Sequence, residues 1–146
     1  MEGRVVQAHF AMARVGSVLV TAIGQGDLTD DEIGEMIKRF DVKDFQTLLF
    51  AARGAGPNSK QRGRIADYWK KSWAKTPRTG LVTDSTAARF VAQAFAWLLN
   101  NEMKAFPSAE LDAAVAYLAS TASVAEVAGA IAALHTAVEF KQRRAG

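Results

Sequence analysis

Cysteine is absent from this sequence, and histidine occurs only at His9 and His135. Without cysteine, the chain can form neither a disulfide nor a cysteine-ligated zinc or iron–sulfur site. Two isolated histidines argue against a histidine-built metal site or a catalytic triad. We therefore expect no catalytic residue, no metal and no cofactor. Both histidines are interpreted as structural, His9 in a strand and His135 in an alanine-rich helix.

Long apolar runs are also missing. The sequence begins Met1-Glu2-Gly3-Arg4, without the apolar stretch of a signal peptide. No apolar run approaches the roughly 20 residues that a membrane-spanning helix needs. We therefore expect a cytoplasmic protein without a membrane span.

Neither charge sign is in large excess, because the net charge is only +3. The sequence has 49% hydrophobic and 23% charged residues, which is ordinary for a globular protein. Its 146 residues are a one-domain length that suffices for a hydrophobic core. We expect a single domain over residues 1–146, with a polyanion-binding face only if the cations cluster in space.

Several apolar segments have the length and composition of strands. The runs 5–13 and 18–23 flank Gly16-Ser17, which predicts a β-hairpin. Further strands are predicted at 45–51, 79–83 and 103–106.

Helices are predicted between and after these strands. Thr29 and Glu32 have the spacing of a capping box, and an apolar repeat from Ile33 to Phe40 follows it. The other helices are expected at 59–75, 86–99, 108–118 and 123–142. In the helix 86–99, the residues expected to be buried are Phe90, Val91, Ala94, Phe95, Trp97 and Leu98.

The order of these elements indicates the fold class. A hairpin followed by alternating strands and helices predicts an α/β fold with right-handed crossovers between parallel strands. We expect a mixed sheet of four to five strands, flanked by helices, with an additional C-terminal helix over 123–142.

A glycine-rich loop precedes the helix 59–75. A phosphate-binding Walker loop needs a glycine directly before its lysine and a hydroxyl residue after it. Here Ser59 precedes Lys60 and Gln61 follows, so a helix cap at Ser59 is favoured over a nucleotide site. Ser59 is also the candidate for a phosphorylation or anion site, because added negative charge is stabilised at a helix N-terminus.

Two further groups of residues are candidates for binding. Asp84-Ser85-Thr86 follows a predicted strand at the edge where ligands collect in α/β sheets, although helix capping accounts for it better. The helix 59–75 interleaves Tyr68, Trp69 and Trp73 with cations, a pattern that suits nucleic acid. Because the aromatic side chains share one face, we favour core packing and expect no specific nucleic-acid binding. The cations of this basic face are Lys60, Arg62, Arg64, Lys70 and Lys71.

The segments from Thr79 to Trp97 and from Met103 to Ala114 resemble small bacterial STAS-like proteins, which are relatives of the anti-sigma-factor antagonists. The resemblance covers roughly residues 18–118. It implies a mixed sheet flanked by helices and a role in protein–protein regulation. Regulatory STAS domains carry an Asp-Ser-Ser/Thr-Gly motif whose hydroxyl a partner kinase phosphorylates. The corresponding segment here ends in Ser59 and lacks that motif, so we expect Ser59 to be unphosphorylated.

The favoured function is a non-enzymatic, STAS-like protein-interaction module in bacterial regulation or assembly. The alternative is a small-ligand or lipid-binding α/β domain, to which a cavity enclosed by the helices would point. The expected partner is another protein, and a homodimer remains open.

Overall fold

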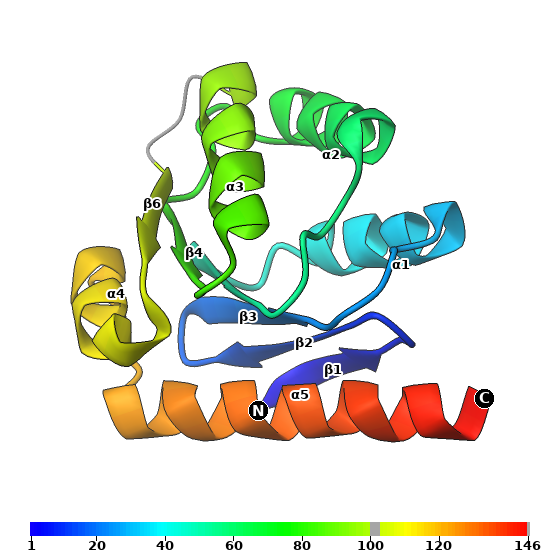
Figure 1. The fold of residues 1–146 in the computed structure, drawn as a ribbon. Coiled ribbons are helices and arrows are strands. Elements are labelled where there is room, and N and C mark those ends of the chain that lie inside the picture. The colour runs from blue at the N-terminus through cyan, green and yellow to red at the C-terminus, as the bar shows by residue number, and fades with distance from the viewer. Residues whose placement is uncertain (100–102, 146) are drawn as a thin grey trace.

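The structure is a computed structural model that describes residues 1–99 and 103–145. Six strands form one mixed sheet in chain order, and helices cover both of its faces (Figure 1). The strands are β1 (Glu2–Val6), β2 (Phe10–Val15), β3 (Val18–Ile23), β4 (Thr47–Ala52), β5 (Thr79–Val82) and β6 (Met103–Phe106). The helices are α1 (Asp30–Phe40), α2 (Ser59–Ser72), α3 (Thr86–Leu99), α4 (Leu111–Leu118) and α5 (Val124–Ala145), with a short 3-10 turn at Ser108–Glu110 before α4.

The expected α/β class, mixed sheet and C-terminal helix are confirmed. β2 and β3 form the expected antiparallel hairpin around Gly16-Ser17, and Gly16 has the positive φ of 58° that such a tight turn favours. β3, β4, β5 and β6 are parallel neighbours, which leaves β5 inside the sheet.

The sheet has one strand more than the four to five expected. The run 5–13, expected to be one strand, is divided by a turn that Gln7 closes by donating its backbone N–H to the Phe10 carbonyl. The extra strand, β1, begins with Glu2, Gly3 and Arg4 and pairs with β2. Arg39 of α1 holds it by donating its Nε to the Gly3 carbonyl at 2.8 Å.

Alternating strand residues supply the two sides of the core, because successive side chains point to opposite faces of a sheet. Ala11, Ala13 and Val20 face α4 and α5, while Phe10, Met12 and Leu19 face α1 and α2. α5 lies along β1, β2 and β3, and α4 covers β5 and β6 (Figure 1). The opposite face of the sheet carries α1, α2 and α3, which enclose an apolar cavity against it.

Candidate functional site

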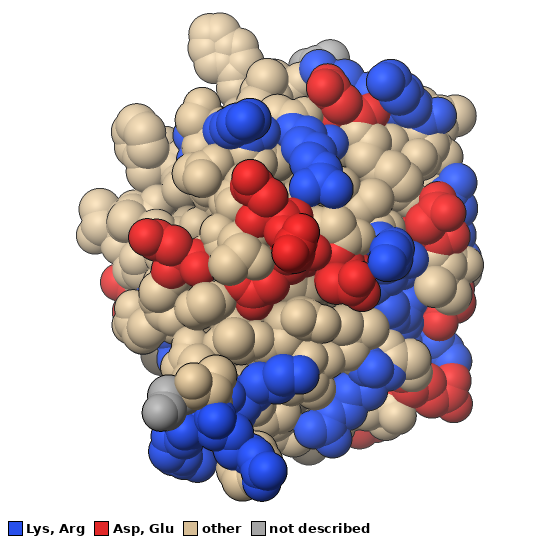
Figure 2. All heavy atoms as spheres, turned by 90° about the vertical axis from the view of Figure 1, so that its right-hand side faces the viewer, with Lys and Arg blue, Asp and Glu red and all other residues tan. Residues whose placement is uncertain are grey.

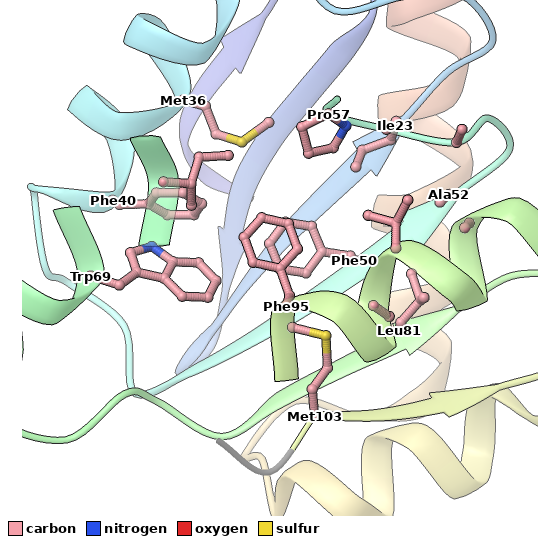
Figure 3. A pocket seen from close by; sticks show the side chains of 16 residues that line it. Ile23, Met36, Phe40, Phe50, Ala52, Pro57, Trp69, Leu81, Phe95 and Met103 are labelled. Carbon is pink, nitrogen blue, oxygen red and sulfur yellow. The ribbon is translucent and has the colours of Figure 1, made fainter. Parts of the chain in front are cut away.

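An apolar cavity of about 50 Å³ lies between the sheet and helices α1, α2 and α3 (Figure 3). Almost all of its surface is apolar, so it can accept an apolar group but would penalise an ionic one. The side chains labelled in Figure 3 that line it are Ile23, Met36, Phe40, Phe50, Ala52, Pro57, Trp69, Leu81, Phe95 and Met103.

Trp69 brings a buried polar atom to this cavity. Its Nε1 has no hydrogen-bond partner among the residues that the structure describes. Figure 3 shows the indole nitrogen on the side of the ring toward Phe40, whose ring stands edge-on to Trp69 with centroids 5.4 Å apart. An N–H group beside an aromatic ring gains only a weak contact. Trp69 Nε1 is therefore a buried donor beside the cavity that the described part of the chain leaves without a strong hydrogen bond.

Three large apolar side chains of α3 face solvent. Phe90, Trp97 and Leu98 are 73%, 82% and 45% exposed, so the expectation that they are buried is wrong. α3 packs instead through residues of its opposite side, of which Ala88, Ala92 and Phe95 are buried. We call the exposed set Phe90, Trp97 and Leu98 the α3 stripe.

Ser59 is the first residue of α2 and does not cap it. Asn58 is the cap: its side chain accepts a hydrogen bond from Gln61 N at 2.9 Å, and Gln61 Oε1 accepts one from Asn58 N at 3.0 Å. The expected cap at Ser59 is therefore wrong by one residue. Asn-x-x-Gln serves here as the capping box, a signal that the sequence contained. Ser59 is exposed at the helix N-terminus, and its role as a modification or anion site remains a prediction.

Asp84, Ser85 and Thr86 lie at the carboxyl end of β5, as expected. Ser85 Oγ caps α3 by accepting from Ala88 N at 3.1 Å. Asp84 accepts from Ser108 N at 3.1 Å, and this hydrogen bond holds the pKa of Asp84 below its ordinary value. Asp84 thus ties the start of α3 to the segment before α4, while binding of a ligand by Asp84, Ser85 or Thr86 remains a prediction.

The basic face of α2 is exposed, but its aromatic residues are not arranged for stacking with nucleic-acid bases. Tyr68, Trp69 and Trp73 pack on one another and on Phe40, with Trp69 and Trp73 centroids 5.8 Å apart. This confirms the core-packing interpretation. Figure 2 shows Lys and Arg side chains over α2 and over the C-terminal end of α5, with acidic side chains over α1 between them. On this face the positive charge is therefore interrupted by acidic side chains.

His9 has a partner that the sequence did not reveal, and it lies in the β1–β2 turn rather than in a strand. His9 N donates to Glu32 Oε2 at 2.9 Å, and Nδ1 lies 2.7 Å from Oε1. Burial raises the pKa of Glu32, but hydrogen bonds from Thr29 and His9 outweigh it and lower that pKa overall. The ionised carboxylate joins the turn to the start of α1, and the expected Thr29–Glu32 capping box is confirmed.

The structure adds two general observations. Within residues 1–99 and 103–145, no three His, Asp or Glu side chains are grouped so that they could hold a metal ion. Over the same residues, no helix has the length and apolar character that crossing a membrane requires.

Comparison with known proteins agrees with the resemblance found in the sequence. A family model described as SpoIIAA-like matches residues 19–119, which run from β3 to the end of α4. A search of curated proteins finds no match. The matched region is more than half of the chain and contains the parallel strands, the start of α2 and the α3 stripe. The chain therefore belongs to the SpoIIAA-like family, a STAS-type fold.

Proposed function

We propose that this chain is a non-enzymatic STAS-type module that binds a protein partner in bacterial regulation or assembly. The observation that carries the proposal is the α3 stripe. Domains of this type generally act as binding modules, which supports the general class of function. The partner surface that we infer consists of the α3 stripe and the neighbouring basic face of α2.

The α3 stripe has the composition of a protein interface. Contiguous exposed apolar side chains on a folded protein mark interaction sites more often than scattered ones do. Tryptophan is enriched among the residues that dominate binding energy, because its large side chain buries much area. Phe90 and Trp97 are seven residues apart, which is about two helical turns, so they project from the same side of α3.

Exposed charges on α2, the helix that packs against α3, indicate what kind of surface would fit the α3 stripe. α2 packs against α3, where the Trp69 and Phe95 ring centroids are 6.0 Å apart. Lys60, Lys70 and Lys71 are exposed on α2 and form no ion pair within the described part of the chain. Because complementary charge steers association, the partner should present an apolar patch flanked by acidic residues.

Photo-crosslinking in the native cells tests this proposal. A photoreactive phenylalanine analogue replaces Trp97 in one variant and Thr136 in a control, since Thr136 is exposed on α5 at the opposite face of the sheet. We expect a defined protein adduct from position 97 alone.

The purified adduct partner should then bind Trp97→Ser at least about tenfold more weakly than wild type, the loss typical of a dominant interface residue. Equal affinities, or the same adducts from both positions, would contradict the proposal. A dimer of this chain as the sole adduct would instead identify a second copy as the partner.

The apolar cavity favours a second candidate function, the binding of a small ligand or lipid. Its volume of about 50 Å³ is well below the roughly 300–1,000 Å³ of ordinary ligand pockets. A lipid chain would therefore require α3 to move away from the sheet.

Solvent extraction of purified protein followed by mass spectrometry tests this function. A stoichiometric apolar molecule in wild type that is lost from Ala92→Leu would support it, because Ala92 lines the cavity. Absence of such a molecule leaves the first function preferred.

A further inference from the structure

A second cleft lies on the opposite face of the sheet, where α5 passes the carboxyl ends of β4 and β5. Its volume is about 280 Å³, several times that of the apolar cavity. This edge of a parallel sheet is where ligands bind in open α/β folds. Most of the wall is apolar, and the polar lining comes from three side chains that are distant in sequence. The lining includes Ala51, Val82, Leu111 and Ile131 as apolar residues, and Arg53, Ser108 and His135 as polar ones. We call this the α5 cleft.

His135 is a buried polar side chain in the wall of the α5 cleft. It is 5% exposed, and its Nδ1 forms no hydrogen bond with any residue in the described part of the chain. Burial lowers the pKa of His135 to about 4, with a further contribution from Arg53, so the ring is neutral at pH 7. A neutral imidazole has one N–H donor and one acceptor nitrogen. The unpaired Nδ1 is itself enclosed by protein atoms, so a ligand in the cleft can reach only the part of the ring that lines it.

Arg53 supplies the positive charge at the rim of the α5 cleft. Its main chain is fixed, because Arg53 N donates to the Ile23 carbonyl and Gln25 Nε2 donates to the Arg53 carbonyl, each at 2.9 Å. Its guanidinium is half-exposed and pairs with the half-exposed carboxylate of Glu139 on α5. An exposed pair of this kind is weak enough to exchange. Glu139 does not itself line the α5 cleft, but its ion pair shows that a carboxylate can reach the Arg53 guanidinium.

We propose that the α5 cleft binds a small organic monocarboxylate. Its acid group would lie between the Arg53 guanidinium and the His135 ring, and its apolar body would cover Leu111 and Ile131. Ser108 contributes to the shape of the cleft and not to binding of the acid group, because its backbone N–H and its side chain both hydrogen-bond to Asp84. The nearby carboxylates of Asp84 and Glu139 disfavour a dianion such as inorganic phosphate. This site is separate from the partner surface on α2 and α3, so either proposal can fail without the other.

Titration of the full chain with hexanoate tests the proposal, with hexanamide as the neutral control and inorganic phosphate as the polyanionic control. Since His9 and His135 are the only histidines, His135→Gln assigns their ring signals in an NMR spectrum. We expect hexanoate to shift the His135 signals saturably and to leave those of His9 unchanged. Hexanamide and phosphate should bind at least about tenfold more weakly, the difference expected from losing or mismatching a charge-assisted hydrogen bond.

Charge variants give the decisive comparison. Arg53→Gln should weaken hexanoate binding about tenfold or more, whereas Glu139→Gln should strengthen it because the competing carboxylate is removed. Arg143→Gln is the matched control, since Arg143 is exposed on α5 and does not line the α5 cleft. Absence of a saturable His135 shift would overturn the proposal. So would equal hexanoate affinities in Arg53→Gln, Glu139→Gln and Arg143→Gln.

Discussion

Trp69 and Trp97 occupy opposite environments, although both belong to helices on the same face of the sheet. Trp69 is 1% exposed on the buried side of α2, and Trp97 is 82% exposed on α3. We predict that Trp69→Ala lowers the free energy of unfolding by about 3–5 kcal/mol, because it leaves a large void in the core. Trp97→Ala should change the free energy of unfolding by no more than about 0.5 kcal/mol. Urea unfolding midpoints measure both effects. Similar losses in the two variants would show that α3 is packed differently.

The capping of α2 allows a test at adjacent residues. Asn58→Ala should lower the free energy of unfolding by about 1 kcal/mol, since it removes the hydrogen bond to Gln61 N. Ser59→Ala should have a smaller effect, because Ser59 is the first helical residue and not the cap. Denaturant titration of both variants measures the difference. A larger loss for Ser59→Ala would place the cap at Ser59 after all.

His135 gives the folded state a defined pH dependence. Burial and the charge of Arg53 lower its pKa from 6.5 to about 4, although Glu139 acts in the opposite direction. Between these values the unfolded chain binds more protons at this site, so acidification favours unfolding. The stability linked to His135 is fully present above about pH 6.5 and is lost as the pH falls toward about 4. His135→Gln should therefore lose less stability than wild type between pH 7 and pH 4, as measured by urea unfolding at each pH. Parallel pH profiles would contradict this prediction.

At the scale of elements, two glycines should respond in opposite ways to replacement by alanine. Gly63 lies within α2 and Gly54 lies in the loop before it, and the quantity that changes is the thermal stability of the protein. In Gly63→Ala, the new Cβ would meet no described atom within 4 Å outside the neighbouring turns of its own helix, and alanine is the better helix former by about 1 kcal/mol. In Gly54→Ala, the Cβ would lie 2.6 Å from the Gly24 carbonyl oxygen, so the backbone between β4 and α2 would have to shift. We expect the first variant to raise the thermal midpoint and the second to lower it, as calorimetry would show. The same direction of change in both would contradict this account.

The sequence was informative where apolar periodicity and turn residues agree. The parallel strands and the helices have such signals, and Thr29 with Glu32 marks the start of α1. β1 lacks them, because it begins with the charged residues Glu2 and Arg4 around a glycine, and the strand is recognisable only through its pairing with β2. α3 is ambiguous for another reason: apolar residues occur on more than one of its sides. The small residues Ala88 and Ala92 are the ones that pack on the sheet, so the size of an apolar side chain was a poor guide to its burial in α3.

The candidate sites were less predictable than the elements. The partner surface depends on the exposure of Trp97, which no local pattern indicated. The α5 cleft brings together Arg53, Ser108 and His135, which belong to different elements and share no motif. Such groupings are decided by long-range packing, and one sequence without its relatives gives no signal for them.

Over the whole molecule, the fold depends on α5 although this helix lies beyond the matched region 19–119. Its buried residues, including Val127, Leu134 and Val138, cover the alanine-rich side of β2 and β3. We predict that a chain ending at residue 123 exposes this apolar face, binds the dye ANS and loses cooperative unfolding.

A chain ending at residue 142 is the control for that truncation, because it retains every buried residue of α5. It should unfold cooperatively at nearly the wild-type midpoint. Cooperative unfolding of both truncated chains would show that α5 is dispensable for the core.

The packing of α5 on the first strands also affects when the protein can fold. Lys141 Nζ donates to the Val6 carbonyl across 135 residues of sequence, and α5 contacts β1, β2 and β3. During synthesis at roughly 5–20 residues per second, the hairpin leaves the ribosome seconds before the helix that covers it. Until then, the apolar side of β2 and β3 is open to solvent and to other nascent chains. The molecule must therefore complete its core after α5 has emerged, and until then its early strands carry an apolar face without its cover.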